Sequence, residues 1–172
     1  MKKATERNDC KVIIMRLPNF FGPNVTNALI KPIFEEAIHN KPIKWLMNAA
    51  IPHQFAFTPD ISKYFHRLTL ETDLPNFFLV NYSGITVSSI KNLGEKISVI
   101  QGNPKKVKVA PKFLLHLIAL FDPEVRELKE NFYQFENSIL LVDDSLKNRY
   151  PEINETTLET ALKITLDWYE NK

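Results

Sequence analysis

Cysteine is almost missing from this chain of 172 residues, which contains Cys10 and no other. No disulfide can therefore form within the chain, and a metal site built on several thiolates is excluded. This cysteine usage is typical of a reducing compartment, so we expect a cytoplasmic protein. The four histidines lie far apart and lack the i, i+4 spacing of a helical metal site, so we predict no bound metal.

Long apolar runs and clusters of one charge are also missing. No stretch approaches the roughly 20 apolar residues that a membrane span needs. The first ten residues include basic side chains but no apolar core behind them, so we expect no secretory signal in this stretch. Lysine and arginine number 22 against 20 acidic residues, with both signs spread evenly. We therefore expect neither a membrane nor a nucleic acid as a partner.

Glycine is scarce, and its four occurrences at positions 22, 84, 94 and 102 form no cluster. The G-x-G-x-x-G turn of Rossmann folds is absent, as are a P-loop and the G-x-S-x-G turn of hydrolases. Nothing in this chain can therefore hold a pyrophosphate in the Rossmann manner.

Short apolar runs alternate with helical patterns along the chain, which predicts an α/β fold. With 44% hydrophobic residues, the length suits one domain covering residues 1–172. Thr58 is the predicted cap of one helix, with Pro59 at its first position, and the last helix opens at Thr156, whose spacing from Glu159 fits a capping box. We expect about five or six helices, and strands at 11–16, 43–47, 53–57, 76–82, 107–110 and 138–142.

The loop after the first predicted strand is a candidate ligand-binding segment. The strand "KVIIMR" ends at Arg16 and runs directly into "LPNFFGP". Its apolar run suits a strand buried on both faces, and loops that leave such strands often hold ligands. We therefore expect functional side chains at this junction.

Two adjacent carboxylates, Asp143 and Asp144, follow the last predicted strand. Paired carboxylates can exchange protons with a substrate. Neighbouring side chains of a strand point to opposite faces, however, so a solvated strand end is the alternative interpretation.

Several stretches together resemble a known family. "VIIMRLPNFFGP", "HNKPIKW" and "HQFAFTPDISKYFHRL" are similar to the C-terminal, substrate-binding half of NAD-dependent epimerase/dehydratase proteins, which are extended or atypical short-chain dehydrogenases/reductases. The later "YQF" and the closing "TTLETALKITLDWY" strengthen the match. The resemblance covers nearly the whole chain from about Lys11. It implies a truncated Rossmann-like fold that lacks the N-terminal dinucleotide-binding half.

The resemblance implies roles for the loop. Pro18, Asn19 and Phe20 occupy the positions that pass beside the nicotinamide in the family, so they are the cofactor-binding candidates. For Phe20, plain core packing is the alternative. The cofactor would be NAD or NADP, which the resemblance alone suggests, and we do not expect this chain to bind it unaided.

The same resemblance implies a substrate pocket. Phe21 would shape it, and His53 and Gln54 fall where the family often places polar groups that face the substrate. Core packing is the alternative for Phe21, and a satisfied surface or core histidine is the alternative for His53. Asp60 matches the Asp of the family pattern, although a carboxylate is favourable in any first helical turn.

The chain departs from the family in its catalytic machinery. The usual Tyr-x-x-x-Lys pair is absent, because no tyrosine has a lysine four places on. The glycine-rich turn and the first strands of the sheet are absent too. We therefore expect no catalytic residues here, and interpret the chain as the substrate-binding portion of an NAD(P)-dependent epimerase, dehydratase or reductase that is not competent alone. The alternatives are a non-catalytic module for a small ligand or a protein partner, or a truncated gene product without activity.

The strand at 11–16 would lie inside a sheet in a whole member of the family. Without its neighbours it exposes an edge and apolar faces. We expect self-association, a separate chain carrying the Rossmann half, or a rearrangement to cover them.

Overall fold

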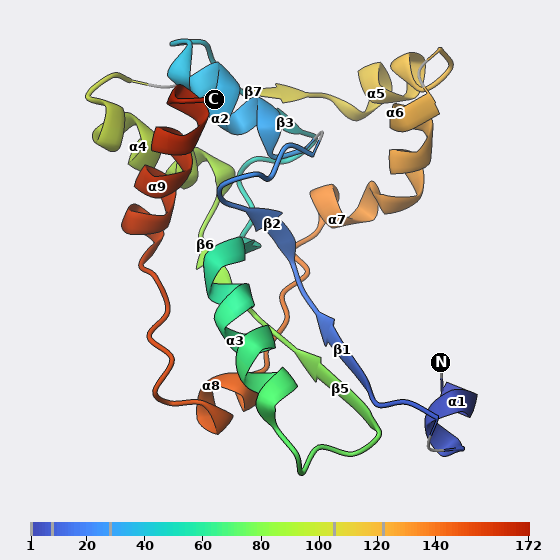
Figure 1. Ribbon diagram of the computed structural model, residues 1–172. Coiled ribbons are helices and arrows are strands. Elements are labelled where there is room, and N and C mark those ends of the chain that lie inside the picture. The colour runs from blue at the N-terminus through green and yellow to red at the C-terminus, as the bar shows by residue number, and fades with distance from the viewer. Residues whose placement is uncertain (1, 8, 28, 105, 122) are drawn as a thin grey trace.

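Figure 1 shows a computed structural model of the chain, which describes residues 2–7, 9–27, 29–104, 106–121 and 123–172. Two parallel strands, β1 (Val12–Arg16) and β5 (Phe77–Asn81), lie in the lower part of this view. β1 follows the short helix α1 (Lys2–Glu6) and pairs with β5. The register places Val12 opposite Phe77 and Arg16 opposite Asn81. The apolar run that predicted the first strand thus forms it, one residue shorter than expected.

A second, three-stranded sheet continues from this pair. β2 (Asn19–Phe21) is parallel to β4 (His53–Phe57), which pairs antiparallel with β6 (Ile85–Val87). Because β1 leads into β2 and β5 leads into β6, the two sheets meet at residues 17–18 and 82–84. A third, parallel pair joins β3 (Ile43–Leu46) to β7 (Val107–Ala110).

Three helices enclose the first hydrophobic core. α2 (Lys31–Ile38), α4 (Ile90–Gln101) and α9 (Leu158–Glu170) each place an apolar face inward, and both α2 and α4 contact α9. Figure 1 shows the three helices together beside β2 and β6. The largest fully buried side chains of this core are Trp45, Phe34, Phe57, Ile30, Ile33, Ile43, Ile90 and Ile97.

The second core lies between the β1–β5 pair and the helices α3 (Thr58–Leu70) and α8 (Ser145–Arg149). Alternate residues of each strand face it, as the period of two in a strand requires. Its buried members are Met15, Ala56, Ile61, Tyr64, Leu68, Leu74, Val80, Tyr82, Leu146 and Tyr150.

The region between β7 and α8 differs from the prediction. Its helical patterns form α5 (Lys112–Ile118), α6 (Pro123–Leu128), the 3₁₀ turn η1 (Lys129–Asn131) and α7 (Tyr133–Glu136). In Figure 1, α5 and α6 stand away from the rest of the chain, whereas α7 places Phe135 in the first core, with 5.8 Å between its ring centroid and that of Trp45. Residues 138–142, predicted as the last strand, have no strand partner among the described residues. The helical region is therefore divided into more and shorter segments than expected.

Two predicted helix starts are also corrected. Thr157, not Thr156, is the N-cap of α9, and its side chain accepts a hydrogen bond from the Thr160 amide at 3.3 Å. Phe57, not Thr58, is the N-cap of α3, and it forms no side-chain capping bond. Tertiary contacts of Thr156, described below, explain the first shift.

Neither a membrane span nor a metal cluster is found within the described ranges. No helix there is both long and apolar enough to cross a bilayer. No three His, Cys, Asp or Glu side chains there lie close enough together to hold a metal ion.

Candidate functional site

A cleft of about 810 Å³ opens at the carboxyl end of β1. One wall comes from the β1–β2 junction, another from the start of β4, and a third from α7 and the segment after it. Its lining residues are Arg16, Leu17, Pro18, Asn19, Phe20, Asn27, His53, Gln54, Tyr133, Gln134, Ile139 and Leu141. Five of the six predicted site residues are therefore brought together in one place.

The β1–β2 junction places Pro18, Asn19 and Phe20 in the cleft. β1 ends at Arg16, and β2 begins at Asn19 in a different sheet, so the chain changes neighbours between them. Gly84 lies against this junction with φ at 65°, and a Cβ added there would lie 2.4 Å from the Phe55 carbonyl oxygen and 3.2 Å from Pro18 Cγ. The close approach of these backbones requires glycine at this position.

Phe20 and Phe21, neighbours on β2, have opposite surroundings. Phe20 lines the cleft and keeps 41% of its surface exposed. Phe21 is 3% exposed and packs against the rings of Phe34, Phe55 and Phe57 in the first core. The expectation that Phe21 shapes a ligand pocket is thus corrected to core packing, because the strand turns successive side chains to opposite sides.

Gln54 holds one wall of the cleft in place. Its Nε2 donates to the Leu141 carbonyl at 3.0 Å and to Thr86 Oγ1 at 3.2 Å, and its Oε1 accepts from the Leu141 amide at 2.6 Å. The side-chain amide therefore pairs with the backbone of residue 141 as a neighbouring strand would. This contact gives Gln54 a structural role beside its predicted contact with substrate.

We expect Gln54→Ala to release the segment 138–142 without unfolding the chain. The substitution removes both hydrogen bonds to Leu141, each worth about 1 kcal/mol. Hydrogen exchange at the Leu141 amide should accelerate several-fold, while the amides of β4 keep their protection. Unchanged exchange at Leu141 would show that other contacts hold the segment.

His53 is buried, with 7% of its surface exposed. Its ring packs edge-on against Trp45, with 5.0 Å between the ring centroids. Nε2 has no hydrogen-bond partner among the described residues. Burial lowers the pKa of His53 below its usual value, and a hydrogen bond with the Asn48 backbone offsets part of that effect. Burial therefore favours the neutral form of the ring over the charged one at the edge of the cleft.

Four polar residues that the sequence prediction did not assign to a site also line the cleft, namely Arg16, Asn27, Tyr133 and Gln134. Arg16 carries the only formal charge among the lining residues, and it forms no ion pair with any residue that the structure describes. Asn27 Oδ1 accepts hydrogen bonds from the Leu29 and Ile30 amides at 3.1 and 2.9 Å, and these bonds fix the start of α2. Tyr133 comes from α7, and no spacing in the sequence connects it to β1.

The tyrosines outside the cleft are not prepared for proton transfer. Burial raises the pKa values of Tyr64, Tyr82 and Tyr150 above their ordinary value, and raises that of Tyr169 to about 12. A catalytic tyrosine needs the opposite shift, toward neutrality. Carboxylates of Glu155 and Asp60 add to the shift at Tyr64.

The adjacent carboxylates Asp143 and Asp144 lie at the start of α8. Asp143 accepts from the Ser145 amide and from Asn81 Nδ2, both at 2.9 Å, and the Ser145 bonds lower its pKa most. Asp144 occupies the N-cap position. Asp143 therefore holds the start of α8 through Ser145, whereas the Asp144 side chain forms no capping bond, and this arrangement favours a structural role over acid/base work.

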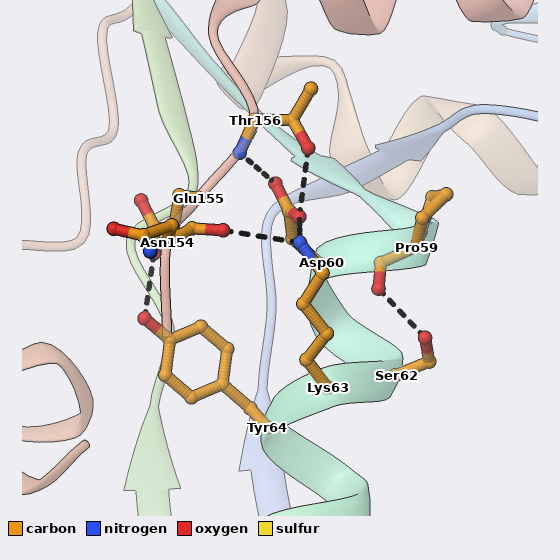
Figure 2. A network of polar contacts seen from close by, with 8 residues as sticks. All are labelled: Pro59, Asp60, Ser62, Lys63, Tyr64, Asn154, Glu155 and Thr156. Atoms are coloured by element: carbon orange, nitrogen blue, oxygen red, sulfur yellow. Dashed lines mark hydrogen bonds and ion pairs between the residues drawn. The ribbon is translucent and has the colours of Figure 1, made fainter. Parts of the chain in front are cut away.

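Asp60 forms the polar network shown in Figure 2. Its fully buried carboxylate accepts from the Thr156 amide at 2.7 Å, from Thr156 Oγ1 at 2.9 Å and from Lys63 Nζ at 2.7 Å. Lys63 also donates to the Asn154 carbonyl at 3.1 Å. The network ties α3 to the segment that leads into α9, and it explains why Thr156 does not cap that helix.

No family model and no curated protein sequence matches the chain. Solved structures do match. UDP-glucuronic acid 4-epimerase from Bacillus cereus, in complex with UDP-glucuronic acid and NAD, aligns with a TM-score of 0.72 at 13% identity, over 99% of this chain and 48% of that one. UDP-N-acetylglucosamine 4-epimerase from Methanobrevibacter ruminantium M1, in complex with UDP-N-acetylmuramic acid, aligns with a TM-score of 0.66 at 21% identity. This alignment covers 99% of this chain and 49% of that one.

The dTDP-glucose 4,6-dehydratase of Bacillus anthracis, in complex with NAD, aligns with a TM-score of 0.63 at 16% identity, over 93% of this chain and 45% of that one. The chain has the fold of part of an NAD-dependent epimerase/dehydratase. This epimerase/dehydratase fold confirms the α/β class and the partial Rossmann-like architecture. The chain spans about half the length of the structures it matches.

Proposed function

We propose that this chain is the substrate-binding portion of an NAD(P)-dependent epimerase, dehydratase or reductase-like protein. The observation that carries the proposal is the cleft, where five residues chosen from the sequence meet at the carboxyl end of a parallel strand. In open α/β sheets, ligands bind outside the carboxyl ends of the strands. The shared fold with nucleotide-sugar epimerases supports the same conclusion.

The ligand class that suits this cleft is a nucleotide sugar. The guanidinium of Arg16 suits the negative charge of a diphosphate, since arginine binds phosphate oxygens through paired N–H groups. The amide of Asn19 and the hydroxyl of Tyr133 suit sugar hydroxyls, and the exposed ring of Phe20 offers a flat apolar surface. Matched structures contain UDP-glucuronic acid or UDP-glucose together with NAD.

The chain's residues do not fit a complete dinucleotide site. Pro18, Asn19 and Phe20 provide one wall for a nicotinamide, but no glycine-rich turn can hold the pyrophosphate. The buried tyrosines described above have pKa values shifted away from neutrality, and no tyrosine has a lysine four places on. We therefore propose that catalysis requires groups from outside these 172 residues, and that NAD alone gives no binding heat.

Calorimetric titration with UDP-glucuronic acid tests the proposal, and Arg16→Ala tests the role of its cation. Hydrogen bonds to a charged group contribute about 1.5–3 kcal/mol. We expect Arg16→Ala to weaken binding at least about tenfold, and Arg16→Lys to weaken it less because it keeps the charge but loses the paired geometry.

Arg7 provides the matched control, because it is exposed outside the cleft and already paired with Asp9 at 2.9 Å. Arg7→Ala should bind as the unaltered chain does. If the Arg16→Ala variant bound UDP-glucuronic acid as tightly as the unaltered chain does, Arg16 would not be part of the binding site. Absence of binding by the unaltered chain to any UDP-sugar would overturn the proposed function and favour the protein-interaction alternative.

A further inference from the structure

One side of α5 is apolar and exposed to solvent. Phe113 and Phe121 keep 74% and 84% of their surfaces exposed, and four aliphatic side chains beside them are exposed as well. Spacings of three and four residues place all six along one side of α5 and the turn that follows it. We call this surface the apolar stripe, which consists of Phe113, Leu114, Leu117, Ile118, Leu120 and Phe121.

The opposite side of α5 already packs against the helices that follow it. Leu115 and Ala119 are buried there, and the ring of His116 lies edge-on to that of Phe132, with 5.5 Å between the centroids. From α6, Arg126 Nε donates to the Ala119 carbonyl at 3.2 Å. A helix at a protein surface usually turns polar residues away from its core, and a contiguous exposed apolar surface marks an interaction site. The apolar stripe is therefore a second side of α5, for which the described chain provides no cover (Figure 1).

Basic residues come directly before the apolar stripe, with no acidic residue among them. The sequence contains no aspartate or glutamate from Lys96 to Phe121. Lys112 at the start of α5 is paired with Glu136 at 2.8 Å. Lys106, just before β7, and Lys108, within it, are exposed and form no ion pair with any residue that the structure describes. The surface before the stripe thus carries positive charge that is not neutralised within the described chain.

This combination suits the surface of an anionic lipid membrane better than a second copy of the chain. A stripe of about ten helical residues is about 15 Å long and about 10 Å wide. A stable protein interface buries about 800 Å² on each partner, which is several times the area of the stripe. A membrane sets no such minimum, because each inserted apolar group and each lysine near anionic headgroups adds its own contribution.

We propose that the apolar stripe lies in the interface of an anionic lipid membrane, with Lys106 and Lys108 among the headgroups. We expected no membrane partner because the sequence lacks a 20-residue apolar run, but a helix that lies flat in the interface needs none. Its apolar side enters the membrane by only about 5–10 Å. The proposal goes beyond the proposed function, because it does not depend on what the cleft binds.

Flotation with lipid vesicles tests the proposal. We would mix the full chain with vesicles of phosphatidylcholine alone, or with vesicles of equal parts phosphatidylcholine and phosphatidylglycerol. We expect the chain to float with the mixed vesicles, with a partition coefficient at least about tenfold higher than for phosphatidylcholine alone. Raising the salt concentration should release it, because salt screens the attraction between the lysines and the headgroups.

Removing the two phenyl rings should abolish most of this binding. The double variant Phe113→Ala/Phe121→Ala loses side chains that are largely exposed, so it should fold as the unaltered chain does, which circular dichroism checks. Its partition coefficient for the mixed vesicles should fall at least about tenfold. Val99→Ala is the matched control, because Val99 is 82% exposed on α4, outside the stripe. It should float as the unaltered chain does.

The lysines provide an independent test. Lys106→Gln and Lys108→Gln should each lower the partition coefficient for the mixed vesicles about fivefold, and should leave that for phosphatidylcholine alone unchanged. Lys163→Gln is the matched control, because Lys163 is exposed on α9 and also forms no ion pair with the described residues. It should leave both partition coefficients unchanged.

Three outcomes would overturn the proposal. The first is absence of flotation with the mixed vesicles, which would leave the stripe to a protein partner. The second is equal partition of the unaltered chain and the double variant. The third is a dimer in sedimentation velocity that the double variant abolishes, which would assign the stripe to a second copy. None of these measurements includes a UDP-sugar, so failure here and failure of the proposed function are distinguishable.

Discussion

Replacing Phe21 with alanine is expected to lower the free energy of unfolding by about 3–5 kcal/mol. The ring is almost fully buried, stacks on Phe34 at 6.3 Å between centroids, and lies 5.3 Å from Phe57. Truncation would leave a cavity between β2, β4 and α2 that the neighbouring rings cannot fill without shifting. Urea unfolding followed by tryptophan fluorescence measures the change, since Trp45 belongs to the same core.

The adjacent residue provides the control. Phe20→Ala removes a ring that is 41% exposed, so the expected loss of stability is about 1 kcal/mol or less. The affinity for a UDP-sugar should show the reverse order, with Phe20→Ala weakening it more. Similar losses of stability in the two variants would contradict the assignment of Phe21 to the core and Phe20 to the cleft.

Asp60→Ala is expected to lower the free energy of unfolding by about 3 kcal/mol or more. The substitution removes the acceptor of three hydrogen bonds and leaves the amide and hydroxyl of Thr156 without their partner. Lys63 is half-exposed, so water can solvate its ammonium after the change. Urea unfolding again supplies the measurement.

Asp9→Ala is the matched control, because the Asp9–Arg7 ion pair is solvent-exposed. Exposed pairs contribute little, so its effect should stay within about 0.5 kcal/mol. Asp60→Asn should fall between the two, since the amide keeps one acceptor oxygen. A loss below 1 kcal/mol for Asp60→Ala would mean that the network in Figure 2 contributes little to the folded state.

The sequence was sufficient where local pattern decides the structure. The apolar run that ends at Arg16 forms β1, although Asn19–Phe21, predicted as part of the following loop, form the short strand β2. "HQFAF" forms β4, as its alternation predicted, and its first two residues line the cleft. Strands of this kind are specified by their own residues and by the turn residues beside them.

The sequence was insufficient to predict the structure where contacts with residues far along the chain determine it. Residues 138–142 are β-rich but meet the side chain of Gln54 instead of a strand. Thr156 has the capping-box spacing from Glu159, but its hydroxyl donates a hydrogen bond to the buried carboxylate of Asp60 instead of capping α9. Tyr133 reaches the cleft only because the chain returns there after α6. Long-range contacts of this kind leave no periodic signal.

The order of the strands has a consequence for how the chain folds. Each paired strand is separated from its partner by at least one helix, so no hairpin is present among the described residues to start a sheet. Val12 must reach Phe77, and Ile43 must reach Val107, before either parallel pair gains its first hydrogen bond. Such a high contact order slows folding, typically to milliseconds or longer. During synthesis, β1 emerges long before β5, so its apolar side chains and unpaired backbone groups spend that interval accessible to chaperones and to other nascent chains.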